Sequence, residues 1–325
     1  MKNKIWMPML ALVLLMMACN TATESEDKSE DKSLHLTLAQ WSLHKGFFGD
    51  ALNGDWAAFG RMLMESPDSL LQGELNPDDF PAIAAGYGFE TIELVNTFYF
   101  SKAKDMAYWE GFKKRCEDAG VNVGLIMCDA LGDIGNADST ARMKAVENHY
   151  DWVKIAKFLG AQSIRVNAAG EGTMEEVAAH AADGLKKLGA YAAAQGINVI
   201  VENHGGYSSD GSWLAGVMKE VNMENVGTLP DFGNFCLERT ADGCAKEYDR
   251  YQGIAELLPY AKGVSAKTLN FDAEGNEANI DYPRIIKLMK EAGFKGNIGV
   301  EYEGEVLSEE EGIKATKALV EKLMY

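Results

Sequence analysis

The stretch GINVIVENHGG, residues 196–206, decides how the rest of the chain is interpreted. Its apolar and β-branched residues are typical of a buried strand, which ends abruptly in Glu202, Asn203 and His204 and then two glycines. Polar groups at the end of a buried strand cost free energy unless they meet partners. The ends of the other predicted strands therefore decide what this stretch means.

Similar apolar runs recur along the chain and alternate with longer stretches of helical period. With residues 197–204, the predicted strands are residues 34–43, 89–96, 121–129, 162–167, 225–234, 261–268 and 297–304. Helix-start signals, such as Asn76 before Pro77 and Thr173 with Glu176, fall between them. This alternation predicts the α/β class, as a (β/α)8 TIM barrel over residues 34–325.

The region after the first predicted strand distinguishes this fold from an open doubly wound sheet. Such a sheet predicts a glycine-rich G-x-G-x-x-G turn there, and the sequence QWSLHKGFFG has none. Residues 45–75 are too many for a loop, so we expect an extra helix and a flap over the mouth of the barrel.

The N-terminal segment has the order of a secretory signal. Lys2 and Lys4 precede an apolar run that ends in LMMAC, which resembles a bacterial lipobox. We expect residues 1–18 to be a lipoprotein signal peptide, Cys19 to be lipidated, and residues 19–33 to form a disordered tether. The alternative is ordinary signal cleavage, with Cys19 incidental. The prediction is an exported, lipid-anchored protein of the periplasm or outer membrane of a Gram-negative bacterium, which meets the membrane only through its anchor.

Charge and cysteine content narrow the class further. A formal charge of −18 argues against a nucleic-acid partner, because such binders need a basic surface. Export would permit a disulfide, for which Cys236 and Cys244 are the nearest pair. Free thiols at these two positions are an equal alternative.

Three carboxylates follow apolar runs at the same depth of the predicted barrel, namely Glu202, Asp231 and Glu301. Active sites of such barrels lie at the carboxyl ends of the strands, so these side chains should face one cavity. Because like charges repel, either their pKa values rise or a cation lies among them. A divalent metal is one such cation, and pairing with Arg165 and Lys267 is the alternative.

The motifs VENHGG, PDFGNF and IGVEYEG resemble those of the sugar (phosphate) isomerase/epimerase group of xylose-isomerase-like TIM barrels. The resemblance implies that Glu, Asp, His and Glu side chains of the last four strands bind one divalent metal. Glu202, Asp231 and Glu301 match three of these ligands, and the two glutamates would also be the catalytic acid/base pair.

The fourth expected ligand is missing, because Ser265 stands where the group has His, followed by Lys267. Three outcomes stay open. His204 supplies the imidazole, or the three carboxylates and water hold the metal, or Lys267 supplies the positive charge without a metal. The metal itself, whether Mn, Mg, Co or Zn, also stays open.

The resemblance implies a metal-dependent sugar isomerase/epimerase that removes a proton next to a carbonyl. Export favours a non-phosphorylated sugar as the substrate. Glu202, Glu301 and Lys267 are the expected catalytic residues, and the expected substrate-binding residues are His44, Glu93, Arg165, Asn167 and Asn203. A lyase or hydratase of keto-sugars or 3-keto-glycosides is an alternative, as is a non-catalytic sugar-binding lipoprotein. Assembly as a homo-oligomer stays open.

Overall fold

The computed structural model describes residue 1 and residues 34–52, 54–240 and 243–324. The predicted signal peptide, the lipidation site Cys19 and the tether lie outside the described residues, apart from Met1. Within the described part of the chain, no helix is long and apolar enough to cross a membrane.

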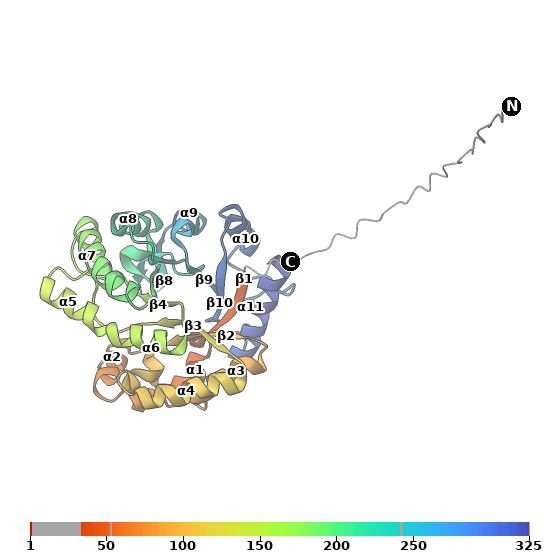
Figure 1. Cartoon of the computed structure of the whole chain (residues 1–325), viewed down its shortest axis with the longest axis horizontal. Coiled ribbons are helices and arrows are strands. Elements are labelled where there is room, and N and C mark those ends of the chain that lie inside the picture. Colours follow the sequence, from red (N-terminus) through yellow and green to blue (C-terminus); the bar gives the residue numbers. More distant parts are fainter. Residues whose placement is uncertain (2–33, 53, 241–242, 325) are drawn as a thin grey trace. The chain divides into compact units, whose positions relative to one another are not determined.

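Parallel strands form the centre of the molecule, with helices around them (Figure 1). The strands are β1 (Leu34–Ala39), β2 (Thr91–Val95), β3 (Asn122–Met127), β4 (Ser163–Val166), β5 (Asn198–Glu202), β6 (Val226–Leu229), β9 (Gly263–Thr268) and β10 (Gly296–Tyr302). Each lies inside or within one residue of a predicted strand, because β-branched apolar runs fit a buried parallel sheet.

The strand order is that of a nearly closed barrel. The sheet runs β6-β5-β4-β3-β2-β1-β10-β9, and parallel bridges Thr228–Ala261 and Asp231–Ser265 join its two edges. The predicted TIM barrel is thereby confirmed, and an open doubly wound sheet is excluded. Closure brings the carboxyl ends of all these strands to one face of the molecule.

Helices follow the strands, and several begin at residues that the sequence marks. The main ones are α3 (Phe80–Gly86), α4 (Met106–Ala119), α5 (Ser139–Asn148), α6 (Tyr150–Leu159), α7 (Met174–Ala193), α8 (Gly211–Val221), α9 (Arg250–Leu257), α10 (Tyr282–Glu291) and α11 (Glu309–Met324). Thr173 and Glu176 form the predicted capping box at the start of α7. Asn76 accepts a hydrogen bond from the Asp78 backbone N–H, in the turn that leads into α3.

The region 45–75 forms α1 (His44–Phe48) and α2 (Trp56–Glu65), joined and followed by short 3-10 turns. This confirms the extra helix expected there. Phe48 packs edge-on against Phe59 with ring centroids 5.0 Å apart, which fixes α2 over the barrel mouth. Trp56, at the start of α2, is 61% exposed.

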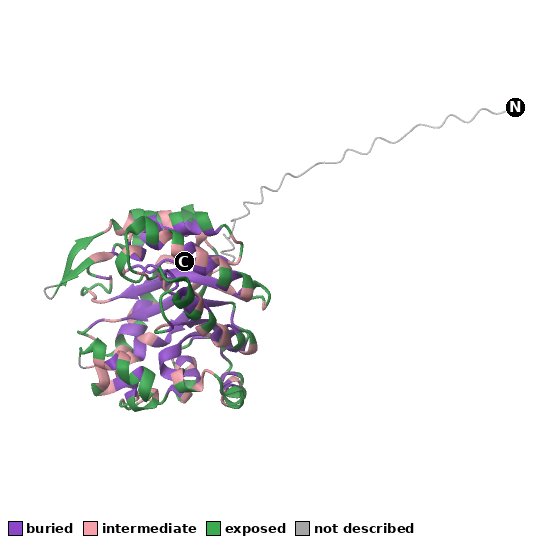
Figure 2. Cartoon of the chain, turned by 90° about the vertical axis from the view of Figure 1, so that its left-hand side faces the viewer, coloured by how far each residue is buried: buried purple, intermediate pink, exposed green. Residues whose placement is uncertain are grey.

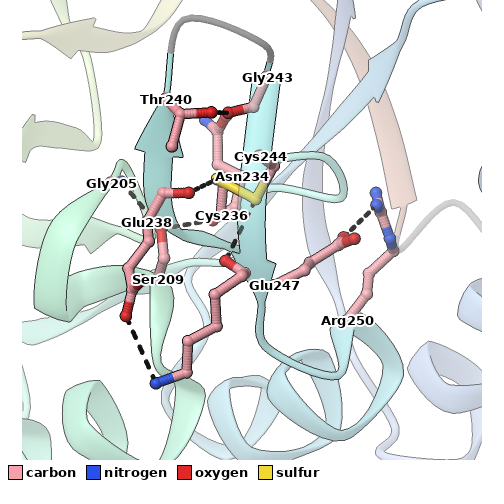
Figure 3. Close-up of a disulfide and its surroundings, with 11 residues drawn as sticks. Gly205, Ser209, Asn234, Cys236, Glu238, Thr240, Gly243, Cys244, Glu247 and Arg250 are labelled. Carbon is pink, nitrogen blue, oxygen red and sulfur yellow. Dashed lines mark hydrogen bonds and ion pairs between the residues drawn. A yellow bond between two sulfur atoms is a disulfide. The ribbon is translucent and has the colours of Figure 1, made fainter.

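An antiparallel hairpin, β7 (Cys236–Thr240) and β8 (Gly243–Glu247), follows β6 and was not predicted. The predicted sixth strand ran to residue 234, whereas β6 ends before Pro230, which cannot donate a ladder hydrogen bond. A disulfide between Cys236 and Cys244 joins the two hairpin strands (Figure 3). Of the two alternatives for these cysteines, the disulfide is therefore the one observed.

Buried residues occupy the barrel and the inner faces of the helices, and exposed residues cover the outside (Figure 2). Trp109 and Trp152 are fully buried between helices and contact each other edge-on. Burial of each such large side chain contributes roughly 1.5–3 kcal/mol to stability. A group of buried polar residues also lies inside this core, at the carboxyl ends of the strands.

Candidate active site at the carboxyl ends of the strands

Arg165 on β4 joins two carboxylates on one side of the barrel. Its Nη1 donates to Asp129 Oδ1 at 2.6 Å. Its Nε lies 2.8 Å from Glu202 Oε2, an ion pair without the alignment of a hydrogen bond. Burial alone would raise the pKa of Asp129, but the adjacent Arg165 lowers it to about 2. On this side of the site, Arg165 therefore fixes the carboxylates of Asp129 and Glu202 and offsets their negative charge.

Asn167 and His204 continue this contact chain toward the surface. Asn167 Nδ2 donates to Asp129 Oδ1 at 2.7 Å, and His204 Nδ1 lies 3.2 Å from Asn167 Oδ1. His204 is exposed. In the described part of the chain, its ring makes no hydrogen bond or ion pair with Asp231 or Glu301.

Asp231 is fixed by backbone and amide hydrogen bonds. Its Oδ1 accepts from the backbone N–H groups of Gly233 and Asn234, both at 2.8 Å. Asn203 accepts from the Asp231 backbone N–H at 2.7 Å and donates to its carbonyl oxygen at 3.0 Å. The predicted substrate-binding residue Asn203 thus ties the end of β5 to the end of β6. Asp231 Oδ2 is buried without a hydrogen-bond partner in the described structure.

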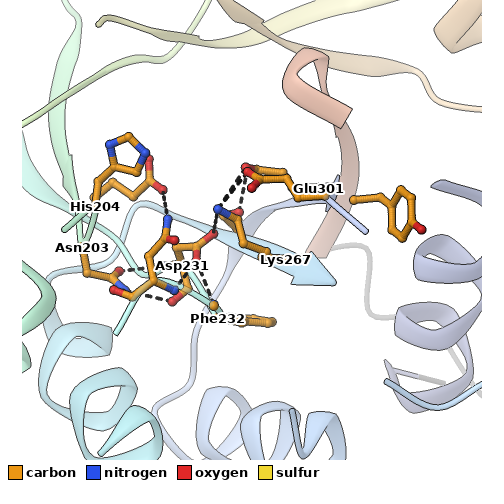
Figure 4. A network of polar contacts seen from close by, with 12 residues as sticks. Asn203, His204, Asp231, Phe232, Lys267 and Glu301 are labelled. Atoms are coloured by element: carbon orange, nitrogen blue, oxygen red, sulfur yellow. Dashed lines mark hydrogen bonds and ion pairs between the residues drawn. The ribbon is translucent and has the colours of Figure 1, made fainter. Parts of the chain in front are cut away.

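Lys267 lies between the carboxylates of Asp231 and Glu301, whereas His204 lies on the other side of Asp231 (Figure 4). Lys267 Nζ is 3.8 Å from Asp231 Oδ2, 3.4 Å from Glu301 Oε1 and 3.0 Å from Glu303 Oε1. Burial would lower the pKa of Lys267, but these carboxylates raise it well above its ordinary value. The side chain is therefore a buried ammonium ion at neutral pH.

Glu301 lies on β10, and Glu303 lies just beyond its end. The pKa values of these two carboxyl groups shift in opposite directions. Burial raises the pKa of Glu301 well above its ordinary value, against the effect of Lys267. Ser265 donates its hydroxyl to Glu301 Oε2 at 2.9 Å. Burial would also raise the pKa of Glu303, but Lys267 beside it lowers that pKa to about 2. The environment therefore favours the protonated form of Glu301 more than that of Glu303, which is ionised near neutral pH.

Glu93 lies deeper, inside the barrel. Thr37 donates to its Oε1 at 2.6 Å, and burial raises the pKa of Glu93 to about 7. Gly299 makes room for it, because a Cβ at that position would lie 2.7 Å from Glu93 Oε2. Glu93 lies on β2, and on that strand Val95, not Glu93, lines the cavity at the carboxyl ends of the strands. Glu93, which was predicted to bind the substrate, is therefore not part of the cavity lining.

A cavity of about 590 Å³ lies over these groups. Its polar lining includes Asp129, Arg165, Glu202, His204, Asn234, Lys267, Glu301 and Glu303, and its rim includes Trp41, Trp56, Phe59, Leu63 and Arg239. The predicted residue His44 is not in the lining, and its ring stacks on Trp41, which is, with ring centroids 5.0 Å apart. The cavity thus combines carboxylates and cations with aromatic faces, a composition found in small-molecule sites.

Several functional candidates escaped residue-by-residue prediction. Asp129, Asn234 and Glu303 lie at the ends of predicted strands, but strand ends are often polar, so only the shared cavity distinguishes them. Trp56 comes from α2, in the region predicted to cover the barrel mouth, whereas Arg239 comes from the hairpin, which was not predicted.

The residues present do not fit the predicted divalent metal. In the part of the chain that the structure describes, no group of three or more His, Cys, Asp or Glu side chains is arranged to hold a metal ion. A cationic side chain lies beside each predicted carboxylate ligand, Arg165 at Glu202 and Lys267 at Asp231 and Glu301. A divalent ion would have to compete with these fixed positive charges.

Comparison with known proteins supports the fold. The family model described as xylose isomerase-like TIM barrel matches residues 81–323. No curated protein matches the chain significantly in sequence. Many solved structures are similar, and three illustrate the range.

A D-psicose 3-epimerase solved with D-fructose is 12% identical, with 76% of this chain and 93% of that chain covered and a TM-score of 0.59. A magnesium complex of a xylose isomerase-like TIM barrel protein from Mycobacterium smegmatis is 19% identical, with coverages of 89% and 96% and a TM-score of 0.59. A 3-keto-D-glucoside 4-epimerase from E. coli is 14% identical, with coverages of 76% and 94% and a TM-score of 0.59. At these identities the likeness shows a shared fold.

Proposed function

The chain belongs to the xylose isomerase-like TIM barrel family, and from this premise we propose that it isomerises or epimerises a non-phosphorylated sugar. The reaction transfers a proton at the carbon next to a carbonyl group. One observation carries the proposal: Glu202 and Glu301 line the same cavity, and the buried Lys267 ammonium lies beside Glu301.

The two glutamates differ in the way that such a reaction needs. Glu202, held by Arg165 and by a hydrogen bond from Asn234 Nδ2 at 3.1 Å, accepts the proton from carbon. Glu301, whose pKa is raised by burial, returns a proton. Two carboxyl groups with different charged neighbours around one cavity are typical of proton-transfer sites.

Lys267 provides the electrostatic stabilisation. As the proton leaves carbon, negative charge develops on the carbonyl oxygen, and a buried ammonium stabilises that enediolate more strongly than water would. The resemblance predicts a divalent metal in this role. We assign the role to Lys267, because its Nζ lies among Asp231, Glu301 and Glu303.

Two observations support the substrate class. Similar structures are named as a D-psicose 3-epimerase, a 3-keto-D-glucoside 4-epimerase and a sugar phosphate isomerase/epimerase, and these names support a sugar with or without a phosphate group. Both buried cations of the site, Arg165 and Lys267, are already paired with carboxylates. Neither of these two cations is therefore free to pair with a phosphate group.

Proton exchange with solvent tests the function. In D2O, the wild-type protein should exchange the proton next to the carbonyl group for deuterium. The substrates are D-fructose, D-tagatose and methyl 3-keto-β-D-glucopyranoside, and 1H NMR measures the loss of the proton signal. Glu202→Gln should abolish this exchange, and the exposed Glu305→Gln should not. Exchange with none of the three sugars would overturn the proposal. Exchange followed by loss of the aglycone would identify the alternative keto-glycoside lyase.

Export with a lipid anchor at Cys19 stays a proposal. The Cys236–Cys244 disulfide supports it, because disulfides persist mainly in oxidising compartments. Labelling of cells with a clickable fatty acid should mark the wild-type chain and leave Cys19→Ala unlabelled. Equal labelling of both chains would contradict lipidation at this residue.

A further inference from the structure

A second cavity of about 770 Å³ adjoins the candidate active site above β4 and β5. His204 and Gly205 line both cavities, so the two are neighbours along one surface. Resting on the proposed function, we propose that the substrate is a keto-disaccharide. Its keto ring would lie over Glu202 and Glu301, and its second sugar ring would lie in this second cavity.

The lining of the second cavity suits a sugar ring. Met174, Val177, Tyr207 and Leu237 offer apolar surface to the C–H faces of a pyranose. Polar groups at its edges include Glu171, Ser208, Asp210 and Glu238. Sites for small molecules combine a mainly apolar lining with a few placed polar groups, and this cavity has that composition.

The backbone between the two cavities leaves space for a bridging ligand. Gly205 and Gly206 have φ angles of 94° and 56°, a conformation that disfavours other residues. A Cβ at either glycine would meet nothing within 4 Å, so both face open space. A ligand can therefore pass close to the backbone from one cavity to the other.

The hairpin β7–β8 forms a wall along both cavities. Leu237, Glu238 and Lys246 line the second cavity, whereas Arg239 lines the first. Figure 3 shows Gly205 and Ser209 beside this hairpin. Ser209 Oγ accepts from the Gly205 N–H and donates to the Asn234 carbonyl, both within 2.9 Å, so the loop after β5 is tied to the base of the hairpin.

The volumes agree with a two-ring substrate. Each cavity lies in the range of about 300–1,000 Å³ that holds a small ligand. The first cavity alone accommodates a monosaccharide, as the proposed reaction requires. A monosaccharide in the first cavity would leave Gly206 and the hairpin residues Leu237, Glu238 and Lys246 without a ligand contact.

Equilibrium binding tests the second cavity separately from catalysis. Calorimetric titration would compare 3-keto-cellobiose with methyl 3-keto-β-D-glucopyranoside on the wild-type protein and two variants. Ala169→Trp adds bulk at an exposed position of the second cavity. Ala179→Trp is the matched control, because Ala179 is exposed on α7 and lies outside the lining of either cavity described here.

The wild-type protein should bind the disaccharide at least about tenfold more tightly than the methyl glycoside. Ala169→Trp should remove that preference without weakening the methyl glycoside, and Ala179→Trp should keep it. Equal affinities in the wild type, or equal losses for both ligands in Ala169→Trp, would overturn the inference. Proton exchange measured in the same samples reports on the proposed function independently of this result.

Discussion

Lys267 Nζ lies 3.4 Å from Glu301 Oε1, on neighbouring strands whose register places these two residues side by side. The pair places a fixed positive charge beside a buried carboxyl group whose pKa is raised by burial. This relationship distinguishes the site from one built around a metal ion, and the first predictions follow from it.

Removal of the Lys267 charge should impair both catalysis and stability. In Lys267→Met, proton exchange should fall by about 10²–10³-fold, the usual effect of losing one charge-stabilising donor. The free energy of unfolding of Lys267→Met should also be lower than that of the wild type by roughly 3–5 kcal/mol, because the variant leaves buried carboxylates without their partner. Exchange kinetics and urea denaturation measure these effects, with the exposed Lys295→Met as the control. Full activity in Lys267→Met would show that another group stabilises the enediolate.

The metal content of the purified protein tests the same assignment from the other side. Elemental analysis of the wild type, after incubation with Mn²⁺, Mg²⁺, Co²⁺ and Zn²⁺, should find no stoichiometric metal. The double variant Ser265→His with Lys267→Met restores an imidazole and removes the ammonium, so it should acquire about one equivalent. Stoichiometric metal in the wild type that disappears in Asp231→Asn would refute the assignment to Lys267.

The two glutamates should fail in different ways. Glu202→Gln should lose proton exchange by about 10²–10⁴-fold, because no base remains to remove the proton. Glu301→Gln should keep measurable exchange at the substrate carbon while it loses product formation, because only the returning proton is missing. NMR of substrate and product separates the two. Identical losses of both signals in Glu301→Gln would argue against separate roles.

Glu93 should make stability depend on pH. Its pKa is about 7 in the folded protein, against an ordinary value of 4.5. The folded state therefore holds this proton more tightly. The contribution of Glu93 to stability is greatest below pH 4.5 and declines as pH rises to about 7. Glu93→Gln removes this dependence, so the variant should gain roughly 2–3 kcal/mol over the wild type between pH 5 and pH 8.

Denaturation curves of both proteins at pH 5 and pH 8 check this prediction. Thr37→Val serves as a control, because it removes the hydrogen bond to Glu93 and keeps the carboxyl group. A difference between Glu93→Gln and wild type that stays constant with pH would mean that Glu93 does not titrate in this range.

Loss of the disulfide should loosen the hairpin and leave the barrel intact. Cys236 and Cys244 are eight residues apart, and closing so short a loop stabilises the hairpin by about 2–3 kcal/mol. In Cys236→Ser with Cys244→Ser, amide hydrogen exchange should rise in residues 243–247 and stay unchanged in β10. Dithiothreitol should reproduce this effect in the wild type and do nothing to the variant. Protection of the hairpin that is unchanged by reduction would contradict the prediction.

Local patterns predicted most of the framework because they act over short distances. Apolar runs marked each barrel strand, and Thr173 with Glu176 marked the start of α7, since side chains there bond to backbone groups three residues away. The hairpin was missed, because β7 and β8 are short and largely exposed and so lack an apolar pattern. The sequence also did not show whether Cys236 and Cys244 form a disulfide.

The sequence by itself determined that Glu202, Asp231 and Glu301 stand at strand ends, because alternation along a strand and the barrel fold place strand ends on one face. Only the tertiary structure decided their partners. Arg165 reaches Glu202 from the neighbouring strand, and Lys267 reaches Asp231 and Glu301 from the strand between them. The cation that balances a buried carboxylate depends on distances across the barrel, and those distances exist only after it has closed.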